Sequence, residues 1–242
     1  MPENNFSQNK STADSISVFF PCYNEQDNVE KTVNAALETL NKLRIDYEII
    51  IVNDGSSDNT AKIADSLAAK NPRIKVIHHR NNLGYGAALQ SGFRAAAKNL
   101  VFYTDGDGQF DIAELPPLIP LIRKFDIVSC YRINRQDNLI RKINGFCWTR
   151  LVCFLFKLKI RDIDCAFKLY KREIFDNMTL TSSGALIDTE ILARAAAKGC
   201  SITQRPVHHF PRTAGKQTGA NPKVILRAFK ELFALRKKIK SL

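Results

Sequence analysis

Short apolar runs alternate with helix-like stripes through the first 104 residues, and this alternation constrains the fold more than any other feature. The apolar runs cover residues 16–20, 47–52, 74–78 and 100–104. The segments between them place apolar side chains three or four positions apart, over residues 28–43, 56–69 and 86–97. Such runs are typical of parallel strands buried on both faces, and such spacing is typical of amphipathic helices. The alternation predicts an α/β fold with a Rossmann-like, mostly parallel sheet flanked by helices.

The length and composition suit a single domain. The chain has 242 residues, 45% of them hydrophobic, which is enough to bury one core. We expect a domain over residues 15–216, a disordered leader at 1–14 and a basic amphipathic helix at 217–242. The leader lacks the pattern of a signal peptide, and the six cysteines show no C-x-x-C pair or metal-finger spacing. Both observations favour the cytoplasm, with the cysteines as small buried side chains.

The net charge of +12 is concentrated in the second half of the chain. Residues 1–120 carry 11 Lys and Arg against 15 Asp and Glu, whereas residues 121–242 carry 25 against 9. This asymmetry indicates an anionic partner, such as nucleic acid, a membrane surface or a phosphorylated substrate, although a solvated basic surface would have the same composition. No apolar run approaches the roughly 20 residues that span a bilayer.

Polar segments follow four of the apolar runs. Ligands of open α/β sheets bind outside the carboxyl ends of the strands, so chemistry is expected in these segments. They are Pro21-Cys22-Tyr23-Asn24-Glu25, Asn53-Asp54-Gly55-Ser56-Ser57-Asp58, Asn81-Asn82-Leu83-Gly84-Tyr85-Gly86 and Asp105-Gly106-Asp107-Gly108-Gln109-Phe110-Asp111. Neither GxGxxG nor a P-loop lysine motif occurs, which disfavours a conventional dinucleotide or P-loop nucleotide site.

Asp105 and Asp107 are the most informative pair in these segments. Only Gly106 separates them, so both carboxylates can converge on one point. Hard oxygen ligands suit Mg²⁺ or Mn²⁺, which proteins usually hold with one or two carboxylates and the phosphates of a substrate. Gln109 could add a neutral oxygen, whereas Asp111 is expected to cap the next helix or turn. An ordinary acidic turn would have the same sequence.

Two other strand ends carry residues that could bind a nucleoside. Asp54 lies near a strand tip and could accept hydrogen bonds from a base or a ribose. Tyr23 and Glu25, beside Pro21, could stack on a base and hydrogen-bond to it. The same residues could instead form turns or begin helices, and Asp58 is assigned to a helix cap.

These segments, taken together and in this order, resemble family 2 inverting glycosyltransferases of GT-A fold. The likeness lies in Pro21 to Glu25, Val52 to Asp58, Asn82-Leu83-Gly84 and Asp105-x-Asp107-x-Gln109. Over residues 15–216 the sequence is most similar to dolichyl-phosphate mannose synthases and related bacterial polyprenyl-phosphate glycosyltransferases. The resemblance implies a nucleotide-sugar half at 15–111 and an acceptor half at 112–216.

The resemblance also assigns residues to the donor. Those expected to bind the nucleotide-diphosphate sugar are Pro21, Tyr23, Asn24, Glu25, Asp54, Gly84 and Asp105. Those expected to hold Mg²⁺ or Mn²⁺ on the donor diphosphate are Asp105, Asp107 and Gln109. The catalytic residues that it implies are Asp105, Asp107 and Arg132. The base and the sugar cannot be read from the sequence, so GDP-mannose, UDP-glucose and UDP-N-acetylhexosamine stay open.

The likeness continues in the second half, in Tyr131-Arg132, in Asp162-x-Asp164-Cys165-Ala166-Phe167-Lys168 and in His209-Phe210-Pro211-Arg212 with Gly215-Lys216. It implies that the acceptor is bound by Arg132, Arg135, Arg141, Arg212 and Lys216. Guanidinium forks match phosphate, and a phosphate monoester attacks without a general base. The implied reaction is metal-dependent transfer to a polyprenyl (dolichyl or undecaprenyl) phosphate at the cytoplasmic membrane face.

A family 2 transferase that glycosylates a hydroxyl of a glycan or polysaccharide precursor is the alternative. A hydroxyl acceptor needs a carboxylate base, for which Asp188 and Glu190 are the candidates, although both could instead cap and orient a helix at 190–197. Nucleic acid is disfavoured as a partner, because no stacking motif or helix-turn-helix signature occurs. Residues 146–160 and 221–242 mix apolar and basic residues, which suits peripheral contact with an anionic inner membrane face. The last helix could instead close the domain or form a homodimer.

Overall fold

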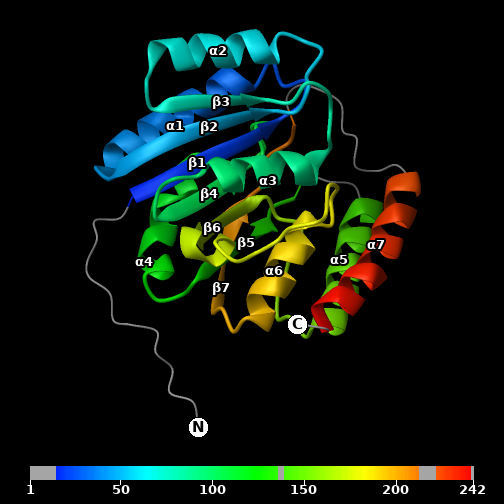
Figure 1. The fold of residues 1–242 in the computed structure, drawn as a ribbon. Helices are drawn as coiled ribbons and strands as arrows, with labels where there is room; N and C mark the ends of the chain where they lie inside the picture. Colours follow the sequence, from blue (N-terminus) through cyan, green and yellow to red (C-terminus); the bar gives the residue numbers. More distant parts are fainter. Residues whose placement is uncertain (1–14, 136–138, 213–221, 241–242) are drawn as a thin grey trace.

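A seven-stranded sheet forms the centre of the molecule. The computed structural model describes residues 15–135, 139–212 and 222–240. The strands are β1 (Ser15–Cys22), β2 (Asp46–Asn53), β3 (Ile74–His78), β4 (Leu100–Thr104), β5 (Ile127–Ile133), β6 (Phe167–Lys171) and β7 (Ile202–His208). Their order is β3-β2-β1-β4-β6-β5-β7, and β6 is antiparallel to β4 and β5, whereas the other pairs are parallel. The expected mostly parallel sheet is confirmed (Figure 1).

Helices cover both faces of this sheet. They are α1 (Val29–Leu43), α2 (Thr60–Lys70), α3 (Tyr85–Ala95), α4 (Ile119–Ile122), α5 (Leu139–Phe156), α6 (Ile187–Ala197) and α7 (Pro222–Lys240), with short 3-10 turns η1 (Ile112–Glu114), η2 (Pro116–Leu118) and η3 (Arg172–Phe175). The three helices expected between the first strands all form. Helix α2 begins later than expected, because the Asp58 carboxylate accepts hydrogen bonds from the N–H and hydroxyl of Thr60.

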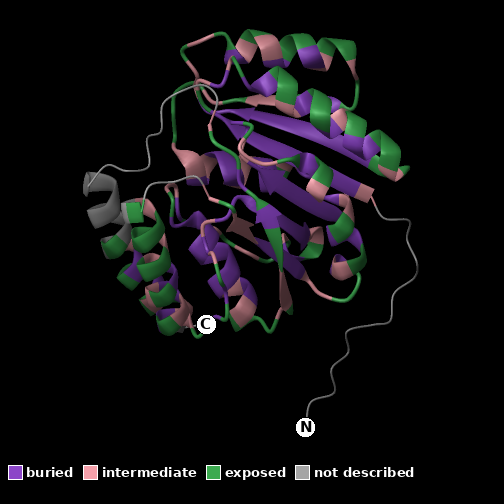
Figure 2. Cartoon of the chain, turned by 180° about the vertical axis from the view of Figure 1, so that it is seen from behind, coloured by how far each residue is buried: buried purple, intermediate pink, exposed green. Residues whose placement is uncertain are grey.

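The first strands are buried on both faces, as their continuous apolar runs require. In β1, Val18 and Phe20 pack in the core shared with α1 and α2, whereas Phe19 packs in the core shared with α3. Figure 2 shows these strands as a buried layer between more exposed helices. Two cores therefore hold the sheet from opposite sides, and the loops at its carboxyl edge rest on a rigid base.

The antiparallel strand β6 changes which residues reach that edge. Its neighbours β4 and β5 bring their last residues to the edge, whereas β6 brings its first. Thr104, at the end of β4, pairs with Phe167, at the start of β6. The segment 162–166, which precedes β6, therefore lies beside the residues that follow β4.

Helices α5 and α7 lie side by side at one end of the molecule (Figure 1). The rings of Trp148 and Phe229 meet edge-on with 5.4 Å between their centroids, and Leu232 of α7 is buried. The outer apolar side chains of α5 are exposed, namely Leu139, Ile143, Phe146 and Phe154. Within the three described segments, none of the helices combines the length and apolar content needed to span a bilayer.

The cysteines and the chain ends were the subject of further expectations. The thiol of Cys147, on α5, is exposed, so the expectation of buried cysteines is wrong at that position. Cys22, Cys130 and Cys165 are buried as expected. The leader at 1–14 and the acceptor-loop residue Lys216 lie outside the described residues.

Candidate active site

The Asp105-Gly106-Asp107 turn follows β4 and packs directly on the end of β1. Gly106 donates its backbone N–H to the carbonyl of Pro21 at 3.4 Å. A Cβ atom at position 106 would lie 2.5 Å from the sulfur of Cys22, so glycine is required for this close approach. The packing holds both carboxylates at the junction of β1 and β4.

The two carboxyl groups lie where charge is poorly solvated. Burial, followed by the charge of Asp107, raises the pKa of Asp105 well above its usual range. Burial also raises the pKa of Asp107, against the opposing effects of the Gln109 N–H and the Arg212 charge. Adjacent carboxylates that are both penalised when ionised favour a nearby cation. The turn therefore has the electrostatics of a cation site.

Arg212, in the segment after β7, brings a positive charge to this turn. Its guanidinium pairs with Glu25, and its Nη1 lies 3.6 Å from Asp107 Oδ2. The side-chain amide of Gln109 donates to the carbonyl of Phe210 at 3.0 Å, and the Phe210 N–H donates back to the Gln109 carbonyl at 2.9 Å. The structure thus places Arg212, which the resemblance assigns to the acceptor, against Glu25 and the acidic turn.

The loops after β1 and β2 are tied to each other. Asn24, whose φ is 55°, donates its backbone N–H to Ser56 Oγ at 2.9 Å and accepts the Ser57 N–H at 2.8 Å. Tyr23, the residue before Asn24, is 43% exposed. Pro21 is the last residue but one of β1. Of the residues expected to meet the nucleoside, Pro21, Tyr23 and Asn24 therefore lie at the end of β1, beside the loop after β2.

Asp54 shapes the loop that precedes α3. Its Oδ1 lies 2.6 Å from His79 Nδ1 and accepts the Leu83 N–H at 2.9 Å. Its Oδ2 accepts the N–H of Gly84 at 2.9 Å. Gly84 has a φ of 98°, a conformation that other residues rarely adopt. The sequence predicts a contact with a base or ribose, and in the structure both oxygens of Asp54 hold this loop.

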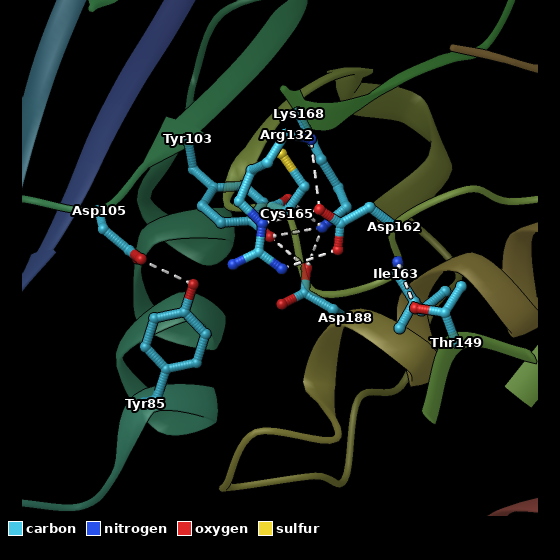
Figure 3. A network of polar contacts seen from close by, with 10 residues as sticks. All are labelled: Tyr85, Tyr103, Asp105, Arg132, Thr149, Asp162, Ile163, Cys165, Lys168 and Asp188. Atoms are coloured by element: carbon cyan, nitrogen blue, oxygen red, sulfur yellow. Dashed lines mark hydrogen bonds and ion pairs between the residues drawn. The ribbon is translucent and has the colours of Figure 1, made fainter. Parts of the chain in front are cut away.

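Tyr85, the first residue of α3, reaches the acidic turn. Its hydroxyl donates to Asp105 Oδ1 at 2.9 Å (Figure 3). The sequence pattern gave this tyrosine no role, because it opens a helix and its apolar ring suits an ordinary core contact. The sequence feature that could have identified Tyr85 is its place directly after Gly84, in one of the four polar segments.

Arg132 and Asp162 form a two-pronged ion pair near the end of β5. Arg132 Nε and Nη2 donate to the two carboxylate oxygens at 2.7 and 2.8 Å. The Arg135 guanidinium lies over Gly145 of α5, with Nη1 3.5 Å from the place of a Cβ atom there. Arg141 lies in the first turn of the same helix. The structure therefore gathers these three arginines where β5 leads into α5.

A buried network stands beside the acidic turn (Figure 3). Lys168 Nζ donates to Asp188 Oδ1 and to the Cys165 carbonyl, both at 2.6 Å, and the Tyr103 hydroxyl also donates to Asp188. The Lys168 side chain is fully buried, and its ion pair with Asp188 compensates for the loss of solvent around the ammonium group. No role was expected for Lys168 or Tyr103 from the sequence, since both lie inside strands rather than after them.

The two alternative bases have different surroundings. The carboxylate of Glu190 accepts the backbone N–H groups of Thr181 and Ser182 and the Nε–H of Arg194, so it orients the segment before α6. Asp188 has one oxygen in the buried network. Among the described residues, its second oxygen receives no hydrogen bond. Asp188 therefore has one oxygen outside the buried network, and Glu190 has the orienting role that the sequence also allowed.

The residues at this edge fit a divalent cation that a substrate completes. In the described segments, no three His, Cys, Asp or Glu side chains gather into a metal site built from protein alone. Asp105 and Asp107 nevertheless supply hard oxygens, and Arg212 already places a positive charge against Asp107. This pattern matches Mg²⁺ or Mn²⁺ held by two carboxylates and by phosphate oxygens of a ligand.

Comparison with known families decides the class of enzyme. Residues 17–179 match the sequence model described as glycosyl transferase family 2. The chain belongs to this family. The resemblance to family 2 glycosyltransferases seen in the sequence is confirmed, whereas the likeness to polyprenyl-phosphate enzymes stays a prediction.

One named glycosyltransferase is similar to this chain in sequence. Glycosyltransferase AglD of Haloferax volcanii is 33% identical to this chain over 207 residues. The match covers 81% of this chain and 33% of AglD. The chain therefore spans about a third of the length of that relative.

Two solved enzyme structures have the same fold as this chain. Glucosyl-3-phosphoglycerate synthase from Mycobacterium tuberculosis, in complex with Mn²⁺, UDP-glucose and phosphoglyceric acid, superposes with a TM-score of 0.67 at 16% identity, covering 95% of this chain and 80% of that one. Mannosyltransferase PcManGT from Pyrobaculum calidifontis, in complex with GDP-Man and Mn²⁺, gives a TM-score of 0.65 at 17% identity, covering 93% and 65%. At these identities the likeness shows the fold, and it confirms the expected GT-A architecture.

Proposed function

We propose that this glycosyltransferase moves a sugar from a nucleotide-diphosphate sugar to a polyprenyl phosphate, with inversion and with the help of a divalent cation. The observation that supports the acceptor assignment is that Arg132 is tied to α5, the helix whose outer face is apolar and exposed. Asp162 holds Arg132, and the next residue, Ile163, donates its N–H to Thr149 Oγ1 of α5 at 3.4 Å. A phosphate at Arg132 would have its lipid chain beside this helix.

The donor side of the proposal rests on the loops after β1, β2 and β4. The two related enzymes bind UDP-glucose or GDP-mannose together with Mn²⁺. In this chain, Asp105 and Asp107, with Gln109, would hold Mg²⁺ or Mn²⁺ on the donor diphosphate. The cation would neutralise the charge of the leaving diphosphate. Tyr23, which is 43% exposed, would stack on the base.

A phosphate acceptor simplifies the chemistry that the protein must supply. An oxygen of the phosphate monoester forms a bond to the anomeric carbon while the bond from that carbon to the donor diphosphate breaks. The diphosphate leaves with the electron pair. No proton is removed from the nucleophile, so the protein needs to orient the phosphate. Asp162 takes Nε and Nη2 of Arg132, so Nη1 is the group that would donate to the phosphate.

Peripheral contact with an anionic membrane, at the cytoplasmic face, would bring the enzyme to such an acceptor. The exposed apolar residues of α5 recur at helical spacing at Leu139, Ile143, Phe146 and Phe154. The neighbouring helix α7 adds Phe233, which is 56% exposed. Basic residues of α7 flank this face, with Lys237 exposed. A helix pair with an apolar stripe and basic flanks suits the interface of an anionic bilayer.

Arg132→Lys tests the acceptor assignment. Lysine keeps the charge but loses the guanidinium fork, so we expect kcat/KM for polyprenyl phosphate to fall about 10-fold or more. Donor binding, measured by calorimetry, should be unchanged. In the native enzyme, radiolabelled sugar should enter the organic-extractable, mild-acid-labile fraction. Unchanged lipid kinetics in the variant, or transfer to a soluble glycan alone, would refute the lipid assignment.

One observation favours a second candidate, which is transfer to a hydroxyl of a glycan or polysaccharide precursor. Lys168 and Tyr103 hold one oxygen of Asp188, and the second oxygen could accept a proton from a hydroxyl (Figure 3). A structurally related enzyme is known in complex with phosphoglyceric acid.

In the same assay, Asp188→Asn separates the two acceptors. A base-dependent reaction should lose about 10²- to 10⁴-fold in rate, whereas a phosphate acceptor should be affected only a few-fold. Because this change leaves Lys168 buried without its charge partner, the double variant Lys168→Met, Asp188→Asn is the control for stability.

A further inference from the structure

The phenol of Tyr85 has no part in the chemistry proposed above, yet it contacts the first carboxylate of the acidic turn. Its hydroxyl donates to Asp105 Oδ1 at 2.9 Å. In Figure 3 the ring stands at the start of α3 and points toward Asp105. We infer that Tyr85 is a positioning residue, whose hydroxyl fixes the rotation of the Asp105 carboxylate and keeps its other oxygen available to a divalent cation. The inference rests on the proposed function, to which the cation belongs.

The start of α3 is held from two sides, so the phenol has a fixed place. On one side, the Gly84 N–H donates to Asp54 at 2.9 Å. On the other side, a Cβ atom at Gly86 would lie 2.4 Å from the Ser182 carbonyl oxygen and 2.7 Å from that of Gly184. Backbone packed this closely cannot slide along the helix axis. The residue between the two glycines therefore presents its hydroxyl at a defined point.

Asp105 depends on this contact. Among the described residues, the Tyr85 hydroxyl is the one hydrogen-bond donor to its side chain. Asp107 stands two positions along the turn, and its like charge would turn a loosely held carboxylate away. A neutral phenol donates a hydrogen bond without adding charge, so it orients Asp105 and leaves its negative charge for a cation.

Mn²⁺ binding without nucleotide tests the inference. The Tyr85→Phe variant keeps the ring and loses the hydroxyl, so the fold should be unaffected. We expect the Kd for Mn²⁺, measured by electron paramagnetic resonance of the unbound ion, to rise about 10-fold. The measurement needs no substrate and no turnover. A matched increase in KM for the donor, with thermal melting unchanged, is the second readout.

Tyr103→Phe is the matched control. Tyr103 is the last residue but one of β4, and its hydroxyl contacts Asp188 and Lys168 rather than Asp105. We expect native Mn²⁺ affinity in this variant. Native affinity in Tyr85→Phe, or an equal loss in both tyrosine variants, would overturn the inference while leaving the cation site standing. Native Mn²⁺ binding in Asp107→Asn would instead refute the proposed cation site itself.

Discussion

Asp164 is a carboxyl group that the proposed chemistry does not use, and its surroundings penalise its charge. Burial, followed by the charges of Asp188 and Asp162, raises the pKa of Asp164 to about 7, against the opposing charges of Arg132 and Lys168. The pKa of Asp164 in the folded protein lies above its value of about 3.9 in the unfolded chain. The contribution of this group to the free energy of unfolding is therefore fully present below about pH 3.9 and is lost as the pH rises toward 7.

Replacing Asp164 with Asn should remove this penalty. The variant should have a higher Tm than the native protein. This increase in Tm should be about 4 °C larger at pH 8 than at pH 4.5, which corresponds to roughly 1–2 kcal/mol. Calorimetric melts at both values of pH measure it. Asp27→Asn, at an exposed position, is the control and should show no such difference. A pH-independent gain for Asp164→Asn would contradict the assignment of a penalised charge.

The residues proposed to bind the cation and the donor were easier to predict than the residues that hold them in position. Asp105 and Asp107 follow an apolar run, and the edge of a parallel sheet is where such residues meet a ligand. Tyr85 and Lys168 act through contacts between elements that are distant in the sequence, so no local pattern reveals them. Arg212 was predicted as a functional residue, but the side on which it lies depends on its pairing with Glu25 across the fold.

Among the elements, β1, β2 and β4 could be predicted closely because burial on both faces leaves few polar positions within them. Strand β3 lies at an edge of the sheet and carries Lys75, but Ile74, Val76 and Ile77 still mark it. The second half lacks this signal. The last strand, β7, lies at an edge of the sheet and its residues Gln204 and Arg205 are polar, so no apolar run marks it. In β6 a lysine interrupts the run, and only its pairing with Asp188 makes Lys168 compatible with burial.

The exposed face of α5 leads to a prediction at this scale. Phe146 is 63% exposed and Phe154 is 79% exposed, so changing both to serine should spare the core. Binding to vesicles of anionic phospholipid, measured by sedimentation, should weaken at least 10-fold, because each buried phenylalanine contributes about 1.5–3 kcal/mol. High salt should weaken the native protein further, through its basic residues.

Leu83→Ser is the matched control for this experiment, because Leu83 is 56% exposed but lies in the loop before α3. It should keep native vesicle binding. An equal loss in the control and in the α5 variant, or no loss in either, would argue against α5 as the membrane-facing surface.

In the whole molecule, one arginine joins segments from both ends of the described chain. Glu25 follows β1, Asp107 follows β4, and Arg212 follows β7, 187 positions after Glu25. The guanidinium pairs with Glu25 and also lies against Asp107, a carboxylate that the proposed divalent cation needs. The arginine and the cation therefore compete for the same negative charge.

Arg212→Gln should accordingly bind Mn²⁺ several-fold more tightly than the native protein in the absence of nucleotide, because it removes the competing charge from a site of low solvation. Arg212→Lys keeps the charge but cannot span both carboxylates, so its affinity should also increase, by a smaller factor. Titration calorimetry measures both variants. Weaker or unchanged Mn²⁺ binding in Arg212→Gln would show that no competition occurs.

The pairing of Arg212 with the two carboxylates bears on the order in which substrates bind. An arginine held by the donor site cannot at the same time hold an acceptor phosphate. Arrival of the cation with the donor would release the guanidinium, and only then would the positive charge be available to the second substrate. The enzyme would thus follow an ordered sequential scheme, with donor first, and departure of the spent nucleotide would return the arginine to Glu25 and reset the cycle.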